Sequence, residues 1–262
     1  MTTVSLSDIG TVWLLGCGNM GGALLRRWVA AGLTRVAVID PAPRTLPGGI
    51  VASCEAPDGV PDVLVVAVKP QLLAQAAAPL VARLGADTLI VSIVAGVSVA
   101  TLSALFEGRR VVRTMPSTPA SIGQGVTALF APGGGRAVAE ALFGAAGTCV
   151  WLDDEAQFDA VTAVSGSGPA YVFAMIEALG AAGVAAGLPP GLAAELALRT
   201  VAGAGQLAAL GEASPADLRA SVTSPNGTTA AGLAVLQPGL DALMQATVAA
   251  AARRSRALGE AV

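Results

Sequence analysis

The sequence predicts an α/β domain built on a doubly wound sheet, followed by an all-helical domain. Short apolar runs alternate with helical patterns over the first half of the chain, which is typical of βαβ units. From about Asp154 onward this alternation stops, and the sequence becomes alanine-rich and helical. We therefore place an α/β domain at residues 1–153 and a helical domain at residues 154–262 of the 262-residue chain.

The composition leaves few charges for the surface. It is 54% hydrophobic and only 13% charged, with a net charge of −3, whereas about 25% of residues are charged in a typical soluble domain. We expect subunit contacts to cover the apolar surface that results. The arginines are scattered rather than clustered, so the sequence does not predict the basic stripe of a nucleic-acid-binding protein.

A short glycine motif follows the first apolar run. Residues 11–16 predict a strand and residues 22–31 a helix, and the turn between them has the spacing G-x-G-x-x-G. Gly16 permits the tight turn, Gly18 lets the backbone approach a pyrophosphate, and Gly21 lets the helix pack on the strand. The helix N-terminus would bind that pyrophosphate. This predicts a Rossmann-type dinucleotide domain, the alternative being a glycine-rich turn without a ligand.

The second predicted strand, residues 35–39, ends at Asp40. A carboxylate at this position accepts hydrogen bonds from a ribose 2′-hydroxyl and favours NADH. Arg44 instead offers a partner for a 2′-phosphate, and Asp40-Pro41 is also compatible with a simple turn. The cofactor is therefore NADPH or NADH, with the preference open.

Further strands are predicted at residues 63–68, 89–94 and 111–115. Ligands of doubly wound sheets bind beyond the C-terminal ends of the strands. The segments expected there are residues 67–70, 95–97 and 115–119.

The uncharged run from Thr88 to Phe106 is the best candidate for a membrane span. Its hydroxyl residues and Gly96 instead predict a strand, a turn and a helix, so we expect no membrane segment. Residues 1–10 lack the basic start and apolar stretch of a secretory signal. Together with the odd number of widely spaced cysteines (Cys17, Cys54 and Cys149), this favours the reducing cytoplasm.

The chain has no histidine, and Lys69 is its only lysine. A Ser-His-Asp triad and a histidine-ligated zinc site are thereby excluded, and we expect no metal. Carbonyl reduction normally needs a tyrosine, histidine or lysine to protonate the developing alkoxide. Reduction of a protonated imine needs mainly positioning against the cofactor and a hydrogen bond to the nitrogen, for which a threonine hydroxyl suffices.

Five helices are predicted in the second half, at residues 154–186, 190–210, 214–221, 226–236 and 239–258. Between Ala160 and Ala194 only Glu177 is charged. A helix without a charged face must be covered nearly all round, so we expect a partner subunit with interleaved helices. The glycines and proline of Ser165–Ala170 predict a kink, made either for close helix packing or for ligand contact.

The run Thr223–Thr229 predicts an anion site. Ser224 suits an N-cap and Pro225 the first helical position, which would leave the N–H groups of Asn226, Gly227 and Thr228 unpaired. Such groups bind anions, although an ordinary capped helix would show a similar pattern. With Thr229 next to them, a carboxylate and an imine nitrogen would be bound together. These are the two groups of a small cyclic imino acid.

At these motifs the chain resembles the pyrroline-5-carboxylate reductase family over nearly its whole length. The matching segments are GCGNMGGAL at Gly16–Leu24, AVKPQ at Ala67–Gln71, RTMPSTPA at Arg113–Ala120, DAVTAVSGSGPAY at Asp159–Tyr171 and VTSPNGTT at Val222–Thr229. The last two are specific to the family. Two positions depart from it, Ser117 where asparagine is usual and Asn226 where glycine is usual, and the connection after Asp40 is too short for the usual helix.

The resemblance implies a site for each ligand. It implies that the cofactor is lined by Leu15, Gly16, Cys17, Gly18, Asn19, Met20, Ala67, Val68, Lys69, Pro70 and Ala95. It implies that Thr229 hydrogen-bonds the imine nitrogen as the catalytic residue, that Ser224, Gly227 and Thr228 bind the carboxylate, and that Glu155 faces the substrate. The family forms intertwined homodimers, some of which assemble further.

The expected function is reduction of 1-pyrroline-5-carboxylate to L-proline, the last step of proline biosynthesis. One alternative is another imine reductase or a hydroxyacid dehydrogenase, although the latter relies on a lysine in its helical domain. A second alternative, of a different class, is a non-catalytic dinucleotide-sensing dimer.

Overall fold

The computed structural model describes residues 4–42 and 46–259. The chain divides into two compact units. The first unit runs to Ser167 and takes in the chain again from Ala250, and the second unit comprises Gly168–Ala249. Arg44 lies outside the described residues. The domain boundary that the sequence predicts, between residues 153 and 154, marks where the strands end and the helices begin. It stays a prediction.

The first unit is built on an eight-stranded sheet with the order β3-β2-β1-β4-β5-β6-β7-β8. Its neighbouring strands are parallel except β6 and β7. The order reverses at β1, as in a doubly wound sheet, which confirms the predicted fold class. The strands are β1 Val12–Leu15, β2 Val36–Ile39, β3 Ala52–Ser53, β4 Val63–Val66, β5 Leu89–Ser92, β6 Val111–Pro116, β7 Gly125–Phe130 and β8 Gly147–Trp151.

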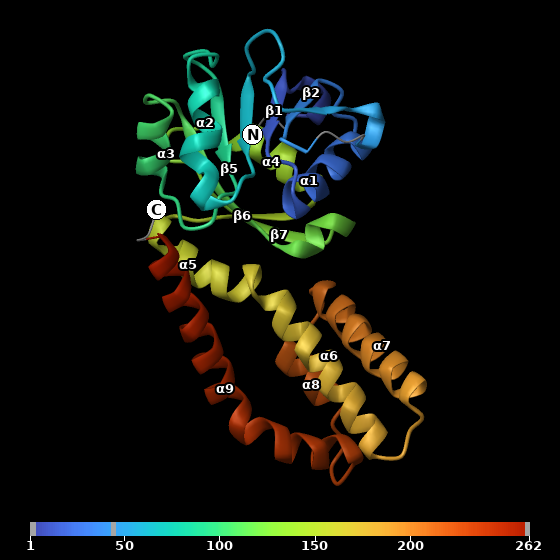
Figure 1. Ribbon diagram of the computed structural model, residues 1–262. Coiled ribbons are helices and arrows are strands. Elements are labelled where there is room, and N and C mark those ends of the chain that lie inside the picture. Colours follow the sequence, from blue (N-terminus) through green and yellow to red (C-terminus); the bar gives the residue numbers. More distant parts are fainter. Residues whose placement is uncertain (1–3, 43–45, 260–262) are drawn as a thin grey trace. The chain divides into compact units, whose positions relative to one another are not determined.

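Helices cover both faces of this sheet (Figure 1). They are α1 Asn19–Ala30, α2 Leu73–Val81, α3 Val99–Leu105 and α4 Arg136–Gly144. One core packs α1 and α4 against the sheet, and there the buried Trp28 donates its indole N–H to the carbonyl of Leu142 at 2.8 Å. The other core packs α2 and α3 around Leu80 and Phe106. Short 3-10 turns connect these elements at η1 Leu6–Asp8, η2 Pro47–Gly49, η3 Pro70–Leu72 and η4 Thr118–Ile122.

Two parts of the first unit differ from the sequence prediction. The short strand β3 and the pair β7 and β8 were not predicted. The connection from β2 to β3 contains no α-helix among its described residues, only the 3-10 turn η2, as its short length suggested.

A π-helical turn interrupts the helix that leaves the first unit. The chain passes through η5 Glu155–Gln157, α5 Phe158–Val161 and the π turn η6 Thr162–Gly166 before α6 begins at Gly168. The N–H of Ser167 donates to the carbonyl of Thr162 at 2.8 Å, five residues earlier. The segment Ser165–Ala170, where the sequence predicts a kink, thus overlaps the end of a π turn, and such turns are one of the recognised causes of helix kinks.

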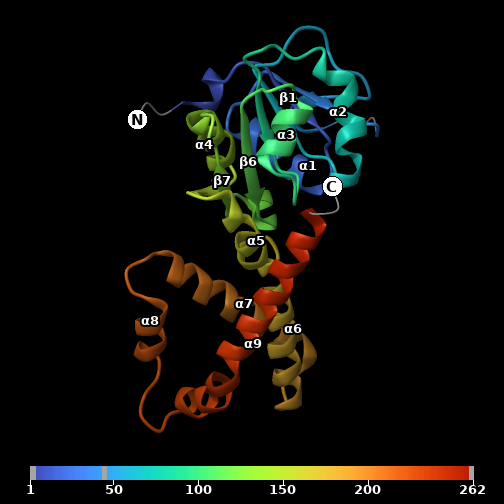
Figure 2. The same ribbon diagram turned by 90° about the vertical axis from the view of Figure 1, so that its left-hand side faces the viewer.

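In the second unit, α6 Gly168–Ala185 and α7 Pro190–Ala209 pack against each other; they run side by side in Figure 1 and cross at an angle in Figure 2. Their contact is made by small residues, because a methyl group added at Gly183 would lie 3.1 Å from the Cβ of Ala193. The other helices are α8 Pro215–Ser221 and α9 Thr228–Gly259.

The prediction of two separate helices at residues 226–236 and 239–258 was wrong. A single helix, α9, continues through Pro238 and passes from the second unit back into the first. Proline removes one backbone donor and strains the preceding turn, but here it does not end the helix.

Candidate active site

The glycine turn lies at the C-terminal edge of the sheet, between β2 and β4. The N–H of Gly16 donates to Ile39 at the end of β2, and the N–H of Ala67 donates to Leu15 at the end of β1, both at 2.8 Å. These bonds fix the turn directly beyond three parallel strands. That is the position where doubly wound sheets bind ligands.

The three glycines of the turn have different physical roles. Gly16 has φ +89°, and a methyl group there would lie 2.8 Å from the carbonyl oxygen of Ala67. At Gly21 a methyl group would lie 2.5 Å from the carbonyl oxygen of Gly16. A methyl group on Gly18 would meet nothing within 4 Å. Gly16 and Gly21 therefore serve packing, whereas Gly18 borders open space, as expected of a position where a ligand approaches the backbone.

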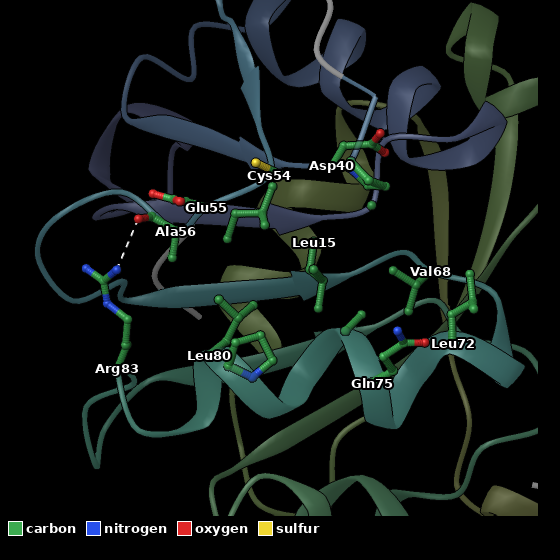
Figure 3. Close-up of a pocket in the computed structure, with 15 residues that line it drawn as sticks. Leu15, Asp40, Cys54, Glu55, Ala56, Val68, Leu72, Gln75, Leu80 and Arg83 are labelled. Atoms are coloured by element: carbon green, nitrogen blue, oxygen red, sulfur yellow. Dashed lines mark hydrogen bonds between the residues drawn. The ribbon is translucent and has the colours of Figure 1, made fainter.

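A first cavity, of about 580 Å³, opens on one side of this turn (Figure 3). It lies between the ends of β1 and β2 and helix α2. Four of the predicted cofactor residues line it: Leu15, Gly16, Asp40 and Val68. Sequence reasoning did not find the other lining residues, which include Cys54, Glu55, Leu80 and Arg83.

A second cavity, of about 650 Å³, lies along the start of α1. It is lined by the remainder of the glycine turn, Cys17, Gly18, Asn19 and Met20, and by Arg26 and Thr118. Since α1 begins at Asn19, its first N–H groups are available to an anion there. Ala67, Lys69, Pro70 and Ala95 lie in the loops after β4 and β5. They line neither of these two cavities, nor the third cavity described below, nor a fourth, which lies between β7, β8 and the π turn.

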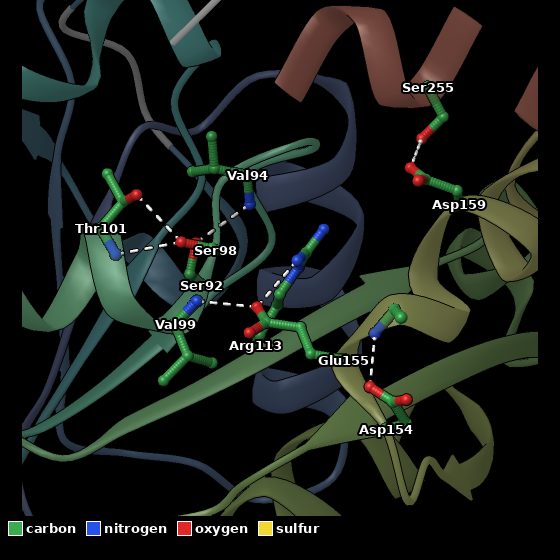
Figure 4. A network of polar contacts seen from close by, with 11 residues as sticks. Ser92, Val94, Ser98, Val99, Thr101, Arg113, Asp154, Glu155, Asp159 and Ser255 are labelled. Carbon is green, nitrogen blue, oxygen red and sulfur yellow. Dashed lines mark hydrogen bonds and ion pairs between the residues drawn. The ribbon is translucent and has the colours of Figure 1, made fainter. Parts of the chain in front are cut away.

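A third cavity, of about 360 Å³, contains Glu155. One carboxylate oxygen of Glu155 accepts the N–H of Val99 at 2.7 Å and pairs with Arg113 at 2.8 Å (Figure 4). The Arg113 guanidinium also stacks on Phe158, 4.2 Å from the ring centre. The other oxygen, Oε2, makes no hydrogen bond within the described parts of the chain. Glu155 thus fixes β6 and the start of α3 while one oxygen stays available.

The other end of the third cavity is closed by the end of α9. Asp159 accepts a hydrogen bond from the Ser255 hydroxyl at 2.8 Å and pairs with Arg256 at 3.4 Å. The backbone of Gly259 packs directly on Gly96 in the turn after β5, so that a methyl group on Gly96 would lie 3.0 Å from the Cα of Gly259. The end of α9 is therefore held to α5 by polar contacts and to the Gly96 turn by backbone packing.

At the predicted anion site of the second unit, the helix starts later in the chain than the sequence predicted. The prediction of Ser224 as N-cap and Pro225 as first helical residue was wrong, because α9 begins at Thr228. Residues 224–227 form a tight turn in which the N–H of Gly227 donates to the carbonyl of Ser224 at 3.0 Å. The carbonyl of Gly227 accepts the first helical bond, from Ala231. The N–H groups left without helical partners are consequently those of Thr228, Thr229 and Ala230.

The two departures from the family pattern both have structural explanations. Asn226 adopts φ +59°, a left-handed conformation that asparagine tolerates better than other non-glycine residues. Ser117 is 5% exposed, and its hydroxyl accepts the N–H of Val126 at 2.9 Å, which ties η4 to β7. Both residues therefore support the local backbone.

The described residues hold no group of three or more metal-ligating side chains, so no metal centre is assigned. Cys149, in β8, lines none of the four cavities. Burial, assisted by the nearby Glu140 carboxylate, raises the pKa of the Cys149 thiol to about 11. This thiol is therefore neutral near physiological pH and takes no part in the site.

Comparison with known proteins identifies the family. Residues 155–258 match the model for pyrroline-5-carboxylate reductase dimerisation, and residues 11–96 match that for NADP oxidoreductase, coenzyme F420-dependent. The chain is 41% identical to the pyrroline-5-carboxylate reductase of Pseudomonas aeruginosa, with 94% of this chain and 96% of that protein covered. It is 39% identical to the Pisum sativum enzyme, covering 97% of each. The chain belongs to the pyrroline-5-carboxylate reductase family.

Solved structures of this family have the same fold. The reductase from Coxiella burnetii superposes with a TM-score of 0.86 at 32% identity, covering 95% of this chain and 98% of that one. The Plasmodium falciparum enzyme, solved with NADP bound, superposes with a TM-score of 0.81 at 26% identity over the same shares. This chain is accordingly an NAD(P)H-dependent oxidoreductase with a Rossmann domain and a helical dimerisation domain.

The dimerisation match accounts for the apolar surface of the helices. Glu155–Ala185 is long and apolar enough to cross a membrane by length and composition. That segment is also where the dimerisation match begins. Its exposed apolar side chains include Phe173, Met175 and Leu179. The reductase is a homodimer, and these exposed side chains lie within the segment that matches the dimerisation model.

Proposed function

We propose that this reductase converts 1-pyrroline-5-carboxylate to L-proline with NADPH or NADH, as the last step of proline biosynthesis. The observation that carries the proposal is the start of α9. It combines three N–H groups without helical partners with the hydroxyls of Thr228 and Thr229. A small ligand with a carboxylate and an imine nitrogen matches these groups, and the chain has no histidine that would serve a carbonyl substrate.

The substrate carboxylate binds at the start of α9. The unpaired N–H groups and the positive end of the helix dipole favour an anion there. Ser224 and Asn226 hold the preceding turn and present their side chains to solvent, while Gly227 and Thr228 bring the backbone close to the ligand. A methyl group at Gly227 would lie 3.1 Å from the carbonyl oxygen of Ser224, so a larger residue would crowd this turn.

Thr229 holds the reacting nitrogen. The imine is bound in its protonated form, and its N–H donates to the Thr229 hydroxyl oxygen. The reduced nicotinamide supplies a hydride, which adds to the carbon of the C=N bond. The electron pair of that π bond moves to nitrogen, which becomes the secondary amine of proline. No side chain has to deliver a proton in this step, which fits a site without histidine and with a single lysine in the chain.

The cofactor lies along the edge of the sheet in the first unit. Leu15, Gly16, Asp40 and Val68 bind the adenosine half in the first cavity, and Cys17 to Met20 bind the pyrophosphate at the start of α1. Ala67, Lys69, Pro70 and Ala95 border the nicotinamide half. Glu155 contacts the substrate through Oε2, the oxygen that its pairing with Arg113 and Val99 leaves available.

We further propose that the reductase works in the cytoplasm and that its dimers associate into a larger assembly. Cys54 and Cys149 are free thiols, which suits a reducing compartment. Light scattering on the purified protein measures the assembly directly, and a mass equal to two chains would exclude anything larger than the dimer.

The activity is tested by mixing the purified protein with 1-pyrroline-5-carboxylate and NADH or NADPH and following the absorbance of the reduced nicotinamide. We expect oxidation of the cofactor that depends on the imine, with proline as the product. If neither cofactor is consumed, the proposed reaction is wrong and a dinucleotide-sensing dimer becomes the better explanation.

The role of Thr229 is tested by Thr229→Ala. Loss of a hydrogen bond to a charged group costs about 1.5–3 kcal/mol, so kcat/KM should fall roughly ten- to hundredfold while cofactor affinity is kept. Thr229→Ser should restore most of the rate. The matched control is Thr247→Ala in the same helix, where the hydroxyl donates to the carbonyl of Leu243. Unchanged turnover in Thr229→Ala would remove Thr229 from this role.

A further inference from the structure

The carboxylate of Asp40 is held in place at the ribose end of the first cavity. Its Oδ2 accepts the N–H of Cys17 in the glycine turn at 2.6 Å, and its Oδ1 accepts the N–H of Ala42 at 2.9 Å. A carboxylate offers about four acceptor positions, so each oxygen keeps capacity for one further donor. Asp40 is therefore oriented by the backbone and able to accept a hydrogen bond from a ligand.

A second carboxylate, that of Glu55, lines the same cavity. Glu55 follows β3 directly, and β3 pairs with β2, whose end carries Asp40. The side chain of Glu55 is exposed and has no hydrogen-bond or ion-pair partner within the described residues. The β2–β3 edge of the cavity thus carries two carboxylates.

Arg83, the one cation among the described residues that line this cavity, already makes contacts elsewhere. Arg83 donates to the carbonyls of Ala56 at 3.1 Å and Pro57 at 2.6 Å. Its guanidinium also lies 3.9 Å from Asp58 and above the ring of Trp13. Figure 3 shows Arg83 at the end of the cavity away from Asp40. Among the described residues, the lining offers no unengaged cation to balance Asp40 and Glu55.

These charges discriminate between the two nicotinamide cofactors, which differ only in a 2′-phosphate on the adenosine ribose. A ribose hydroxyl donates a hydrogen bond to a carboxylate. A phosphate monoester carries about −1.5 to −2 charges near neutral pH, is mostly an acceptor, and is repelled by both carboxylates. We infer that this reductase selects NADH over NADPH, with Asp40 as the specificity-determining residue and Glu55 as its support. The inference rests on the proposed function, since it concerns the cofactor of that reaction.

One relative of this chain was solved with NADP bound. In the present chain the ribose end of the cavity carries Asp40 instead of an unengaged cation among the described residues. Arg44, which the sequence offers as a partner for a 2′-phosphate, and Arg26, which lines the second cavity, are the two arginines able to oppose this selection. Both belong in the test.

The experiment measures binding in the absence of imine, so that no turnover takes place. NADH and NADPH are titrated separately into the homodimer and the heat of binding is recorded. We expect NADH to bind at least about tenfold more tightly than NADPH, a difference of ~1.4 kcal/mol. In Asp40→Asn, the Kd for NADPH should be within about threefold of the Kd for NADH, chiefly because NADPH binds more tightly. The amide oxygen of asparagine still accepts the Cys17 N–H, but the negative charge is removed.

Two further variants separate charge from structure. Glu55→Gln should reduce the ratio of the NADPH Kd to the NADH Kd by a smaller factor, because Glu55 is exposed and its charge is partly screened by solvent. Asp87→Asn is the matched control. It removes one exposed carboxylate from the first unit and lies outside every described cavity, so the ratio should stay unchanged. Thermal unfolding of each variant verifies that the fold is kept.

Three outcomes would overturn the inference. They are tighter binding of NADPH than of NADH, a ratio that Asp40→Asn leaves unchanged, or NADPH binding that collapses in Arg44→Gln or Arg26→Gln while NADH binding does not. Failure of the proposed function looks different. In that case NADH would bind and discriminate as expected, but 1-pyrroline-5-carboxylate would not be reduced.

Discussion

The glycine turn shows how much a few residues determine at the cofactor site. Gly16 and Gly21 are needed because a methyl group at either would press on the backbone, whereas Gly18 is open on its outer side. The sequence predicted this turn correctly because the spacing of its three glycines is itself the signal, although the contact that excludes a side chain at Gly16 comes from Ala67, far along the chain. Gly18 is therefore the position where a side chain should harm ligand binding without harming the fold.

Gly18→Ala tests that distinction. The added methyl group meets no protein atom within 4 Å, so the free energy of unfolding should change by less than about 1 kcal/mol. The methyl group occupies the space beside the pyrophosphate, and the Kd for NADH should rise roughly tenfold or more. Calorimetry measures the Kd and urea denaturation the stability. Gly144→Ala, at the open C-terminal end of α4, is the control, and equal binding by the two variants would contradict the assignment.

The start of α9 shows where residue patterns mislead. Ser224 and Pro225 have the side chains of a helix start, yet the helix begins at Thr228. The left-handed Asn226 and the bond from Gly227 to Ser224 close a tight turn first. Serine-proline favours a turn as much as a cap, so the pattern alone does not distinguish them. The sequence predicted unpaired N–H groups at residues 226–228, and the later helix start moves them to residues 228–230.

At the level of elements, long periodic segments were predicted and irregular ones were not. β1, β4 and β5 are buried on both faces and appear as continuous apolar runs. β8 alternates half-buried with exposed residues, and β3 has only two residues, so neither gives such a run. The continuity of α9 through Pro238 was missed for a different reason, because proline usually marks a helix end and only packing along the helix overrides it.

The end of α9 is held by Asp159, and this contact is open to a direct test. Asp159→Ala removes the hydrogen bond from Ser255 and the pairing with Arg256, which together are worth about 1–2 kcal/mol. Amide hydrogen exchange in residues 250–259 should accelerate roughly five- to thirtyfold, with the strands of the sheet unaffected. Asp153→Ala, at an exposed position, is the control. Unchanged exchange would mean that the Gly96 contact alone holds the helix end.

For the whole molecule, the sequence predicted a partner but not the path of the chain. The nearly uncharged stretch from Ala160 to Ala194 indicated a covered surface, and the family match confirms a dimerisation domain. The return of residues 250–259 to the sheet was not predictable, because it depends on contacts between residues about 100 to 160 positions apart, such as Asp159 with Ser255 and Gly96 with Gly259. No periodic pattern encodes such pairings.

Phe173→Lys tests the dimer surface. Phe173 is 59% exposed in the single chain, and a lysine there would leave a buried charge in an apolar interface. We expect the protein to elute as a monomer in size-exclusion chromatography with light scattering and to lose most of its activity. Val60→Lys is the control, since Val60 is equally exposed at 59% but lies in the first unit. A stable, active dimer of Phe173→Lys would exclude this face from the interface.

The packing of Gly259 on Gly96 also has a consequence for synthesis on the ribosome. All eight strands of the sheet have been made once Trp151 is translated, so the sheet is able to form early. The segment that covers the Gly96 turn and satisfies Asp159 is translated about 100 residues later. Throughout that interval the nascent polypeptide displays an uncovered turn and an uncompensated carboxylate. This vulnerable intermediate ends only when the last helical turns emerge from the exit tunnel and dock.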